Sequence, residues 1–142
     1  MYNLVGEYHF KLDSKGRLSL PSPFRKALPR ELFVTQSPES DCLYVFDADG
    51  FGTWVESLFA RSGGFDSSNR SHVRARTLLN SRAKKVDVDS SGRIGIPQSL
   101  RDAAGLEKEV AVVGNTDHFQ IWDAKRWDEF VKETDLDPLF TS

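Results

Sequence analysis

The sequence predicts an α+β fold made of two pseudo-symmetric halves, in which short β-strands alternate with short flanking helices. The main observation is a repeated phrase: "DSKGRLSLP" begins at Asp13, and "DSSGRIGIP" begins 76 positions later at Asp89. Apolar and polar residues alternate with a period of two around both phrases, which is typical of half-buried strands. Residues that favour helix starts and ends follow each phrase. These features together indicate one strand–turn–strand–helix unit that is present twice.

The repeat extends beyond the phrase when the chain is shifted by 76 residues. Apolar character is kept where identity fails, as with Leu18 and Ile94. Two copies are too few for a solenoid, so a pseudo-twofold pair is expected. The further identical pairs are Pro21 with Pro97, Arg25 with Arg101, Ala27 with Ala103, Glu31 with Glu107, Val34 with Val110 and Asp47 with Asp123.

Each phrase is predicted to form the tip of a β-hairpin. Gly16 and Gly92 can adopt the positive φ that such tight turns need. A second pair of strands is predicted to follow in each copy. The predicted strands are 8–12, 18–20, 32–36 and 43–46 in the first copy, and 86–88, 94–96, 109–113 and 118–122 in the second.

A short helix is predicted after each phrase. In the first copy Ser22 is the expected N-cap, Pro23 occupies the first helical position, and Pro29 ends the helix. In the second copy Gly105 is the expected helix end. The other expected elements are closing helices near 50–61 and 124–134, a loop at 62–68, and a basic helix at about 69–82 with Ser67 or Ser68 as its N-cap.

These elements divide the chain into four segments. A half of this size is marginal alone, and its strand edges would be exposed. We therefore expect the halves to interlock into one sheet-rich core, with further burial in an oligomer. The predicted segments are a first half at 5–58, a linker loop and basic helix at 59–82, a second half at 83–130, and the end of the C-terminal helix with an irregular tail at 131–142.

The charge is unevenly distributed along the chain. The formal net charge of −2 by itself argues against a nucleic-acid ligand. However, residues 1–31 carry six basic and three acidic side chains, and residues 61–85 carry seven and one, giving +3 and +6. Residues 32–60 carry five acidic and no basic side chains, and residues 86–142 carry twelve and six, giving −5 and −6. Because phosphate responds to the local field, such a chain can still present a DNA-binding face.

Several function classes find no support in the sequence. There is no membrane-length apolar run and no signal-peptide pattern, so a cytoplasmic protein without a membrane partner is expected. The single cysteine, Cys42, leaves no internal disulfide, and its acidic neighbour disfavours a catalytic thiolate. His9, His72 and His118 lack metal-ligand spacing. No P-loop, dinucleotide-binding or G-x-S-x-G motif is present, so we expect no enzyme, cofactor, metal or small-molecule effector.

The aromatic residues allow two interpretations. They could form a stacking platform for single-stranded nucleic acid. Their positions in or beside the predicted strands and closing helices favour packing in the core or at a subunit contact instead. The residues concerned are Phe46, Phe51, Trp54, Phe119, Trp122 and Trp127.

The chemistry of the repeated phrase lies in its Asp-x-x-Gly-Arg core. In a tight turn the aspartate can accept N–H groups from the residues that follow it, and the arginine can return beside the carboxylate. This pattern is short, and alone it indicates only a turn with an ion pair. Asp13, Gly16, Asp89, Gly92 and Arg93 are accordingly assigned to support of the two turns.

The first phrase adds a second cation at the turn. Lys15 and Arg17 are two residues apart, so both side chains can point to one side. A two-stranded ribbon fits the DNA major groove, where arginine can bind guanine through two hydrogen bonds. Lysine would mainly contact phosphate. Ser91 replaces the lysine in the second phrase, so the first phrase is the better candidate for DNA contact.

The basic helix offers a second set of candidates. Arg70 and Arg74 lie one helical turn apart and are possible phosphate contacts, which would position DNA without reading its sequence. A solvated face is the plainer alternative. Pairing with acidic groups across a subunit contact is another.

The two Asp-x-x-x-Arg motifs and their flanks resemble the MraZ family of bacterial transcription regulators, whose halves are SpoVT/AbrB-like. The resemblance is carried by "LDSKGRLSLP", by "RARTLLNSRAKKVDVDSSGRIGIP" and by "LRDAAGLEKEVAVVGNTDHFQIWD", and it covers about residues 5 to 130. It implies two AbrB-like halves of the swapped-hairpin, β-barrel type. It also implies a ring-shaped homo-oligomer associated with the nucleoid.

The same resemblance implies a function. Members of the family bind short G-rich tandem repeats in double-stranded DNA, upstream of the division and cell-wall gene cluster that includes their own gene, and regulate its transcription. The contacts come from the first motif of several subunits, which here places them at Lys15 and Arg17. The role of the second motif is left open between structural and inter-subunit.

Two other functions remain as alternatives. A scaffold ring without a nucleic-acid ligand would use the Asp–Arg pairs as interface bridges, and the net charge of −2 is its best support. A hydrolase using Asp13 or Asp89 would need a partner base or a metal cluster, and the sequence offers neither.

Overall fold

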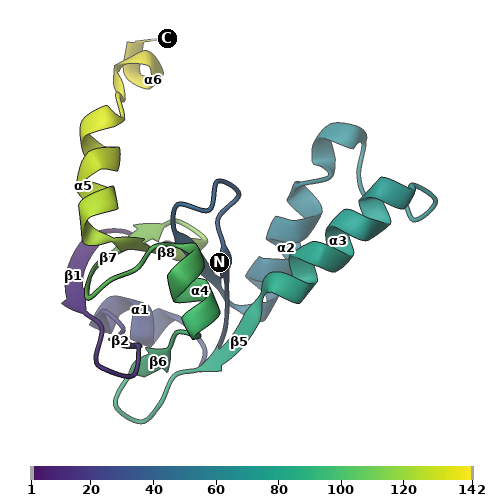
Figure 1. Ribbon diagram of the computed structural model, residues 1–142. Helices are drawn as coiled ribbons and strands as arrows, with labels where there is room; N and C mark the ends of the chain where they lie inside the picture. Colours follow the sequence, from purple (N-terminus) through teal and green to yellow (C-terminus); the bar gives the residue numbers. More distant parts are fainter. Residues whose placement is uncertain (1, 142) are drawn as a thin grey trace.

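The computed structural model describes residues 2–141 and places all strands in two antiparallel sheets (Figure 1). The larger sheet has the strand order β1-β7-β8-β4-β3-β5, and the smaller sheet pairs β2 with β6. The α+β class is therefore confirmed. The strands are β1 (Glu7–Lys11), β2 (Arg17–Ser19), β3 (Glu31–Gln36), β4 (Leu43–Phe46), β5 (Lys84–Asp87), β6 (Arg93–Gly95), β7 (Glu109–Asn115) and β8 (His118–Asp123).

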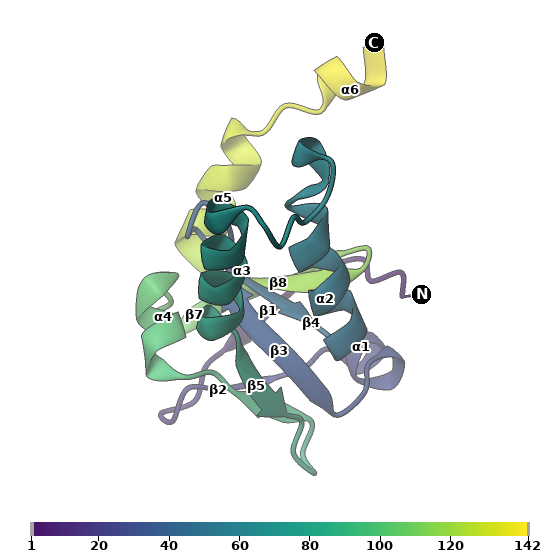
Figure 2. The ribbon, with the colours of Figure 1, turned by 90° about the vertical axis from the view of Figure 1, so that its right-hand side faces the viewer.

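The longer helices α2, α3 and α5 project from the body that the sheets form (Figure 1). Figure 2 shows α2 and α3 side by side, and the same pair projects as an arm from the body in Figure 1. The helix α5 rises from the body on the other side of the molecule (Figure 1). The helices are α1 (Ser22–Ala27), α2 (Ala48–Ser57), the 3-10 turn η1 (Ala60–Ser62), α3 (Arg70–Arg82), α4 (Gln98–Ala103), α5 (Ala124–Glu133) and α6 (Asp137–Thr141).

The larger sheet contains strands of both sequence copies in a symmetric order. Exchanging β1 with β5, β3 with β7 and β4 with β8 reverses the strand order and leaves it otherwise unchanged. The two halves meet at the β4–β8 pair, where Tyr44 lies opposite Gln120. Each outer strand pairs with the other half, β1 with β7 and β5 with β3. The expected interlocking of the halves in one core is therefore present.

The hairpin prediction is wrong in its strand pairing. Asp13 and Asp89 do open tight turns, but β1 and β2 do not pair with each other beyond the first turn, and neither do β5 and β6 beyond the second. In both turns two backbone bonds close the loop, and the strands then diverge into different sheets. Period-two alternation indicates which face of a strand is buried but not which strand lies beside it, so the sequence pattern could not reveal this exchange.

The shift of 76 residues does not hold along the whole repeat. Leu32 pairs with Val86, whereas Val110 pairs with Phe10, and Phe10 lies 76 positions before Val86. Leu32 is thus the counterpart of Val110, at a shift of 78. The proposed matches of Glu31 with Glu107 and of Val34 with Val110 are therefore wrong. The second copy has thirteen residues between β6 and β7, where the first has eleven between β2 and β3. A shorter connection between β7 and β8 then restores the shift of 76 at Asp47 and Asp123, since Val34 pairs with Val45 and Val112 pairs with Ile121.

The helix caps differ from two of the predictions. Ser22 lies inside α1, and Pro21 occupies the N-cap position without a side-chain bond. Asn69, rather than Ser67 or Ser68, caps α3, because its side-chain oxygen accepts the N–H of His72 at 3.1 Å. The predicted irregular tail contains the short helix α6, where the N–H of Phe140 is bonded to the carbonyl of Leu136. Asp137 followed by Pro138 is a favourable helix start that the sequence analysis overlooked.

The core lies between the sheets and their short helices. Leu18 of β2 and Ile94 of β6 are fully buried, so the central residue of each strand of the small sheet packs in the core. Four of the six aromatic residues predicted to pack are buried, and Trp54 and Trp127 are partly buried against their clusters. Packing within the chain therefore accounts for these rings.

Leu18→Ala should destabilise the protein by about 2–5 kcal/mol, because truncating a fully buried leucine removes apolar contacts and leaves a cavity. Val5→Ala is the control, since Val5 is 64% exposed, and it should change the free energy of unfolding by less than about 0.5 kcal/mol. Urea unfolding followed by circular dichroism measures both. Equal midpoints for the two variants would contradict the assigned core.

Candidate nucleic-acid interface

The first turn is organised by the carboxylate of Asp13. Its Oδ1 accepts the backbone N–H of Lys15 at 2.9 Å and that of Arg17 at 2.8 Å. Its Oδ2 accepts the side-chain Nε–H of Arg17 at 2.6 Å. The carbonyl of Asp13 also accepts the N–H of Gly16, which has a φ of +75°. One side chain therefore fixes both the backbone of the turn and the direction of its arginine.

The second turn repeats this backbone geometry with a looser side-chain pair. Asp89 Oδ1 accepts the N–H groups of Ser91 and Arg93, each at 2.9 Å. Arg93 Nε lies 3.4 Å from Asp89 Oδ2, which is an ion pair without hydrogen-bond geometry. Gly92 takes a φ of +77°. The two turns are thus equivalent in backbone but not in side-chain contacts.

The two turns lie side by side because β2 and β6 pair. Leu18 lies opposite Ile94 in this pair, and Leu20 donates its N–H to the carbonyl of Gly92. Arg93 Nη1 lies 3.8 Å from Asp13 Oδ2, so the second arginine reaches the first carboxylate. The structure therefore brings the predicted support residues of both motifs into one cluster.

Each turn also packs against an arginine from the helix of the other half. Arg101 of α4 lies against Gly16 and donates its Nε–H to the carbonyl of Ile96 at 3.0 Å. Arg25 of α1 lies against Gly92 and donates Nη2–H to the carbonyl of Ser90 at 3.3 Å. The sequence analysis recorded these arginines only as repeat matches. Their identity at equivalent positions was the signal that could have identified them.

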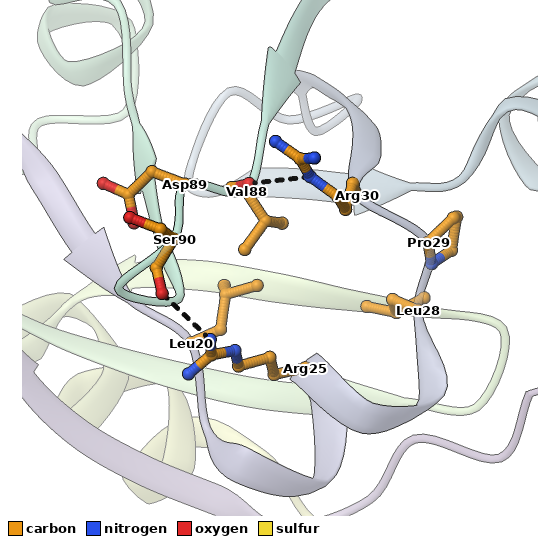
Figure 3. Close-up of a pocket in the computed structure, with 8 residues that line it drawn as sticks. All are labelled: Leu20, Arg25, Leu28, Pro29, Arg30, Val88, Asp89 and Ser90. Carbon is orange, nitrogen blue, oxygen red and sulfur yellow. Dashed lines mark hydrogen bonds between the residues drawn. The ribbon is translucent and has the colours of Figure 1, made fainter.

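Figure 3 shows the Arg25 contact at the edge of a pocket of about 320 Å³ beside the second turn. Arg25 points toward the Ser90 carbonyl, and Arg30 donates Nε–H to the carbonyl of Val88 at 3.3 Å. The carboxylate of Asp89 also lines the pocket. Further guanidinium groups thus lie beside the paired turns and add to the positive potential there.

The two predicted DNA contacts have groups free to bind a ligand. Lys15 is exposed, and its ammonium has no partner among residues 2–141. Arg17 uses Nε to bind Asp13, and within the same part of the chain neither Nη atom has a partner. A guanidinium held at one nitrogen, with the other two left without partners, is preorganised for a two-bond contact.

The turn geometry lowers the pKa of both aspartates. The pKa of Asp13 is lowered to about 2, chiefly by the backbone N–H of Arg17, with the Arg17 side chain and the Lys15 N–H acting in the same direction. The pKa of Asp89 is lowered too, chiefly by the backbone N–H of Arg93. Both carboxylates are therefore ionised at neutral pH. Each partly neutralises the arginine beside it, Arg17 or Arg93, and leaves other N–H groups of that guanidinium available as donors.

Arg70 and Arg74 do not join this cluster. Both side chains are exposed on α3, and neither has an ion-pair partner among the described residues. The end of α3 that begins at Arg70 lies at the tip of the α2–α3 arm, away from the β1–β2 and β5–β6 turns (Figure 1). A duplex held by the turns would have to extend along the arm to reach them.

Other chemistry finds little support within residues 2–141. No group of three histidine, cysteine, aspartate or glutamate side chains could hold a metal ion there. Burial raises the pKa of the Cys42 thiol to about 12, so the nucleophilic thiolate is not populated. No helix in the described part of the chain has the length and apolar character needed to span a bilayer.

Gly16→Ala should destabilise the protein by about 1–3 kcal/mol, because a φ of +75° disfavours any Cβ. The added Cβ would also collide with the guanidinium of Arg101. Gly52→Ala is the matched control in α2, where no atom lies within 4 Å of the added Cβ, and it should stabilise by about 0.5–1 kcal/mol. Urea unfolding compares the two. Equal stabilities would show that the turn does not require glycine.

The lowered pKa of Asp13 predicts a pH dependence of stability. The carboxylate has its ordinary value of 3.8 in the unfolded chain and about 2 in the folded one, so its contribution is present above about pH 4 and is lost as the pH falls through about 2. Asp13→Asn should therefore show a shallower loss of stability between pH 4 and 2. Urea midpoints measured across this range test it, and identical slopes for both proteins would refute it.

Comparison with known proteins places the chain in a family. The model of the MraZ family, described as "MraZ protein, putative antitoxin-like", matches residues 4–74 and 79–141. The transcriptional regulator MraZ of Treponema denticola is 34% identical over 134 residues, which is 94% of this chain and 91% of that protein. The transcriptional regulator MraZ of Kocuria rhizophila is 40% identical over 129 residues, which is 91% of this chain and 87% of that protein. The chain therefore belongs to the MraZ family.

Proposed function

We propose that the protein is a sequence-specific DNA-binding regulator of transcription. Its curated relatives are named transcriptional regulators. The observation that carries the proposal for this chain is the first turn, where Asp13 holds Arg17 by Nε and neither Nη atom has a partner among residues 2–141. The exposed Lys15 lies two residues away. These are the two side-chain types that read guanine and neutralise phosphate.

This geometry supports the following proposed residue roles. Arg17 contacts the O6 and N7 of guanine in the major groove, and Lys15 contacts phosphate. Asp13 and Gly16 shape the first turn. Asp89, Gly92 and Arg93 shape the second turn, and Arg93 braces the first through its contact with Asp13. Ser91 stands at the position of Lys15, so the second turn lacks the phosphate-binding cation.

The ligand is double-stranded DNA with short G-rich tandem repeats upstream of the division and cell-wall gene cluster that includes the protein's own gene. This part of the proposal rests on the family. So does the ring-shaped homo-oligomer, in which several first turns would meet successive repeats. We further propose that the halves are AbrB-like swapped hairpins at 5–58 and 83–130 joined by 59–82, that the protein is cytoplasmic and nucleoid-associated, and that it uses no cofactor or effector and has no enzymatic activity.

A scaffold ring without DNA is the second candidate, and one observation favours it. Asp13 contacts both Arg17 and Arg93, which lowers the positive charge that the motifs offer to phosphate. These pairs lie within one chain, so they are not the interface bridges that the sequence analysis expected of a scaffold. Salt dependence separates the two functions, because binding through lysine and arginine releases counterions and weakens steeply as salt rises. Fluorescence anisotropy with a labelled duplex from upstream of the protein's own gene, against a scrambled duplex at two salt concentrations, makes the comparison.

Arg17→Lys should reduce the preference for the upstream duplex over the scrambled one by about 5- to 150-fold, because the two-bond contact with guanine is worth about 1–3 kcal/mol. Lys15→Ala should instead weaken binding to both duplexes alike and reduce the salt slope by about 1. Anisotropy titrations measure both effects.

Ser91→Ala is the matched control in the second turn and should change neither the preference nor the slope. Light scattering checks that assembly is unaffected in all three variants. Unchanged sequence preference in assembled Arg17→Lys protein would remove Arg17 from the proposed contact. Absence of any preference in the wild-type protein, with assembly intact, would favour the scaffold.

A further inference from the structure

The side of α3 that faces away from α2 is basic and partly apolar. Arg70, Arg74 and Leu78 follow one another at intervals of four residues, so they form a stripe along the helix. Val73 lies on one side of this stripe and Arg82 continues it. Leu78 is 53% exposed and Val73 is 40% exposed. We call these five residues the α3 outer face.

The opposite side of α3 packs within the chain. His72 packs against Phe59, which follows α2, and Leu79 packs against the cluster that contains Phe51 and Val55 of α2. Arg76 pairs with Glu56 at 3.4 Å and lies over the ring of Phe65. The three arginines of the outer face have no such partner among residues 2–141. The helix therefore presents three unpaired guanidinium groups beside two exposed apolar side chains.

The C-terminal end of the chain has the complementary character. Residues 128–141, which we call the acidic C-terminal segment, contain five acidic side chains and one basic side chain, a net charge of −4. None of the five forms an ion pair within the described residues. Val131 is 51% exposed, Leu136 is 55% exposed and Phe140 is 73% exposed. The segment thus combines negative charge with exposed apolar surface.

The two surfaces match in charge and lie apart in one molecule. The α3 outer face contains three arginines and no acidic residue, a net charge of +3 against the −4 of the segment. In Figure 1 the segment extends from α5 on one side of the body, and α3 lies in the arm on the other side. Opposite charges with apolar side chains between them favour contact and specify orientation. A single copy in this arrangement cannot join its own two surfaces.

We propose that the acidic C-terminal segment of one copy binds the α3 outer face of the next copy. The occupant is a second copy of this chain, because the chain itself carries the surface of matching charge and apolar character. The contact joins two different surfaces, so it is a head-to-tail contact that generates a ring where the rotation closes. This inference rests on the homo-oligomer of the proposed function and names the contact that would build it.

The same inference gives Arg70 and Arg74 a role other than phosphate binding. Binding to DNA phosphates through α3 would leave Leu78 and Val73 exposed and gain no free energy from them. A protein contact would bury both side chains, which is favourable. The position of α3 away from the turns also separates these arginines from the proposed DNA contacts. Phosphate binding at α3 is therefore treated as the competing outcome of the test.

Charge reversal on each surface tests the contact. One variant carries Arg70→Glu and Arg74→Glu, and the other carries Glu133→Lys, Asp135→Lys and Asp137→Lys. Each alone should fall to the mass of a single chain in light scattering, because like charges then face each other. An equimolar mixture should assemble again with the two variants alternating, since the reversed α3 of one variant then meets the reversed segment of the other and the unchanged surfaces meet in the next contact.

The control reverses two lysines that belong to neither surface, Lys11→Glu with Lys108→Glu, and should keep the wild-type mass. Circular dichroism establishes that every variant is folded. Wild-type mass in both single-surface variants, or failure of the mixture to assemble, would overturn the contact. A wild-type protein that is itself a single chain would overturn it together with the proposed ring.

DNA binding is measured on the same proteins to separate the two proposals. Retained sequence preference with reduced avidity in the unassembled variants supports the contact and leaves the assignment of Arg17 and Lys15 intact. A loss of DNA affinity in Arg70→Glu with Arg74→Glu protein that keeps its wild-type mass would overturn the contact in favour of phosphate binding at α3.

Discussion

The exchange of the outer strands between the two halves is the constraint on which the structure depends. β1 completes the second half by pairing with β7, and β5 completes the first half by pairing with β3. Neither half could bury its outer strand with its own residues. These pairs join residues about a hundred positions apart in one case and about fifty in the other, so loop-closure entropy opposes them until both halves are present. The halves are therefore expected to fold as one unit.

The same exchange builds the candidate interface. Because β1 and β5 leave their turns toward the large sheet while β2 and β6 leave toward the small one, the two turns meet at one end of the molecule. Arg101 then reaches the first turn from the second half, and Arg25 reaches the second turn from the first half. A turn held from both halves loses little conformational freedom on binding, so more of its interaction energy appears as affinity.

Much of this arrangement could be predicted from the sequence, because local signals carry it. The alternation around Phe10 and the glycine at position 16 identify a strand and a turn, and Asp13 four residues before Arg17 identifies the carboxylate that holds the arginine. Strand partners could not be predicted, because alternation specifies a buried face and not a neighbour. The displaced match at Val34 went undetected because a two-residue shift keeps the same face of a strand buried.

The contacts that the sequence analysis missed are those that depend on three-dimensional proximity. Arg25 and Arg101 each act on the turn of the other half, and only their identity at equivalent positions of the repeat distinguishes them from other surface arginines. The same limit applies to α3, whose outer face is recognisable only once the structure shows that His72, Arg76 and Leu79 face α2. The charge pattern along the chain indicated a basic helix but not which of its arginines were already paired.

The proposed contact between copies also bears on how an acidic protein selects DNA. A chain with two basic regions could place a duplex on either one, and the wrong choice would compete with the turns. If the acidic C-terminal segment of the neighbour covers α3, the arginines of the arm are neutralised and the turns remain as the main basic surface. A single turn with Lys15 and Arg17 would bind weakly, but several turns fixed in the proposed ring would meet the proposed repeated sites at high effective concentration. The same contact would place several turns in one assembly and would neutralise the competing basic surface on α3. Assembly would then raise the affinity for DNA and leave the turns as the surface that binds it.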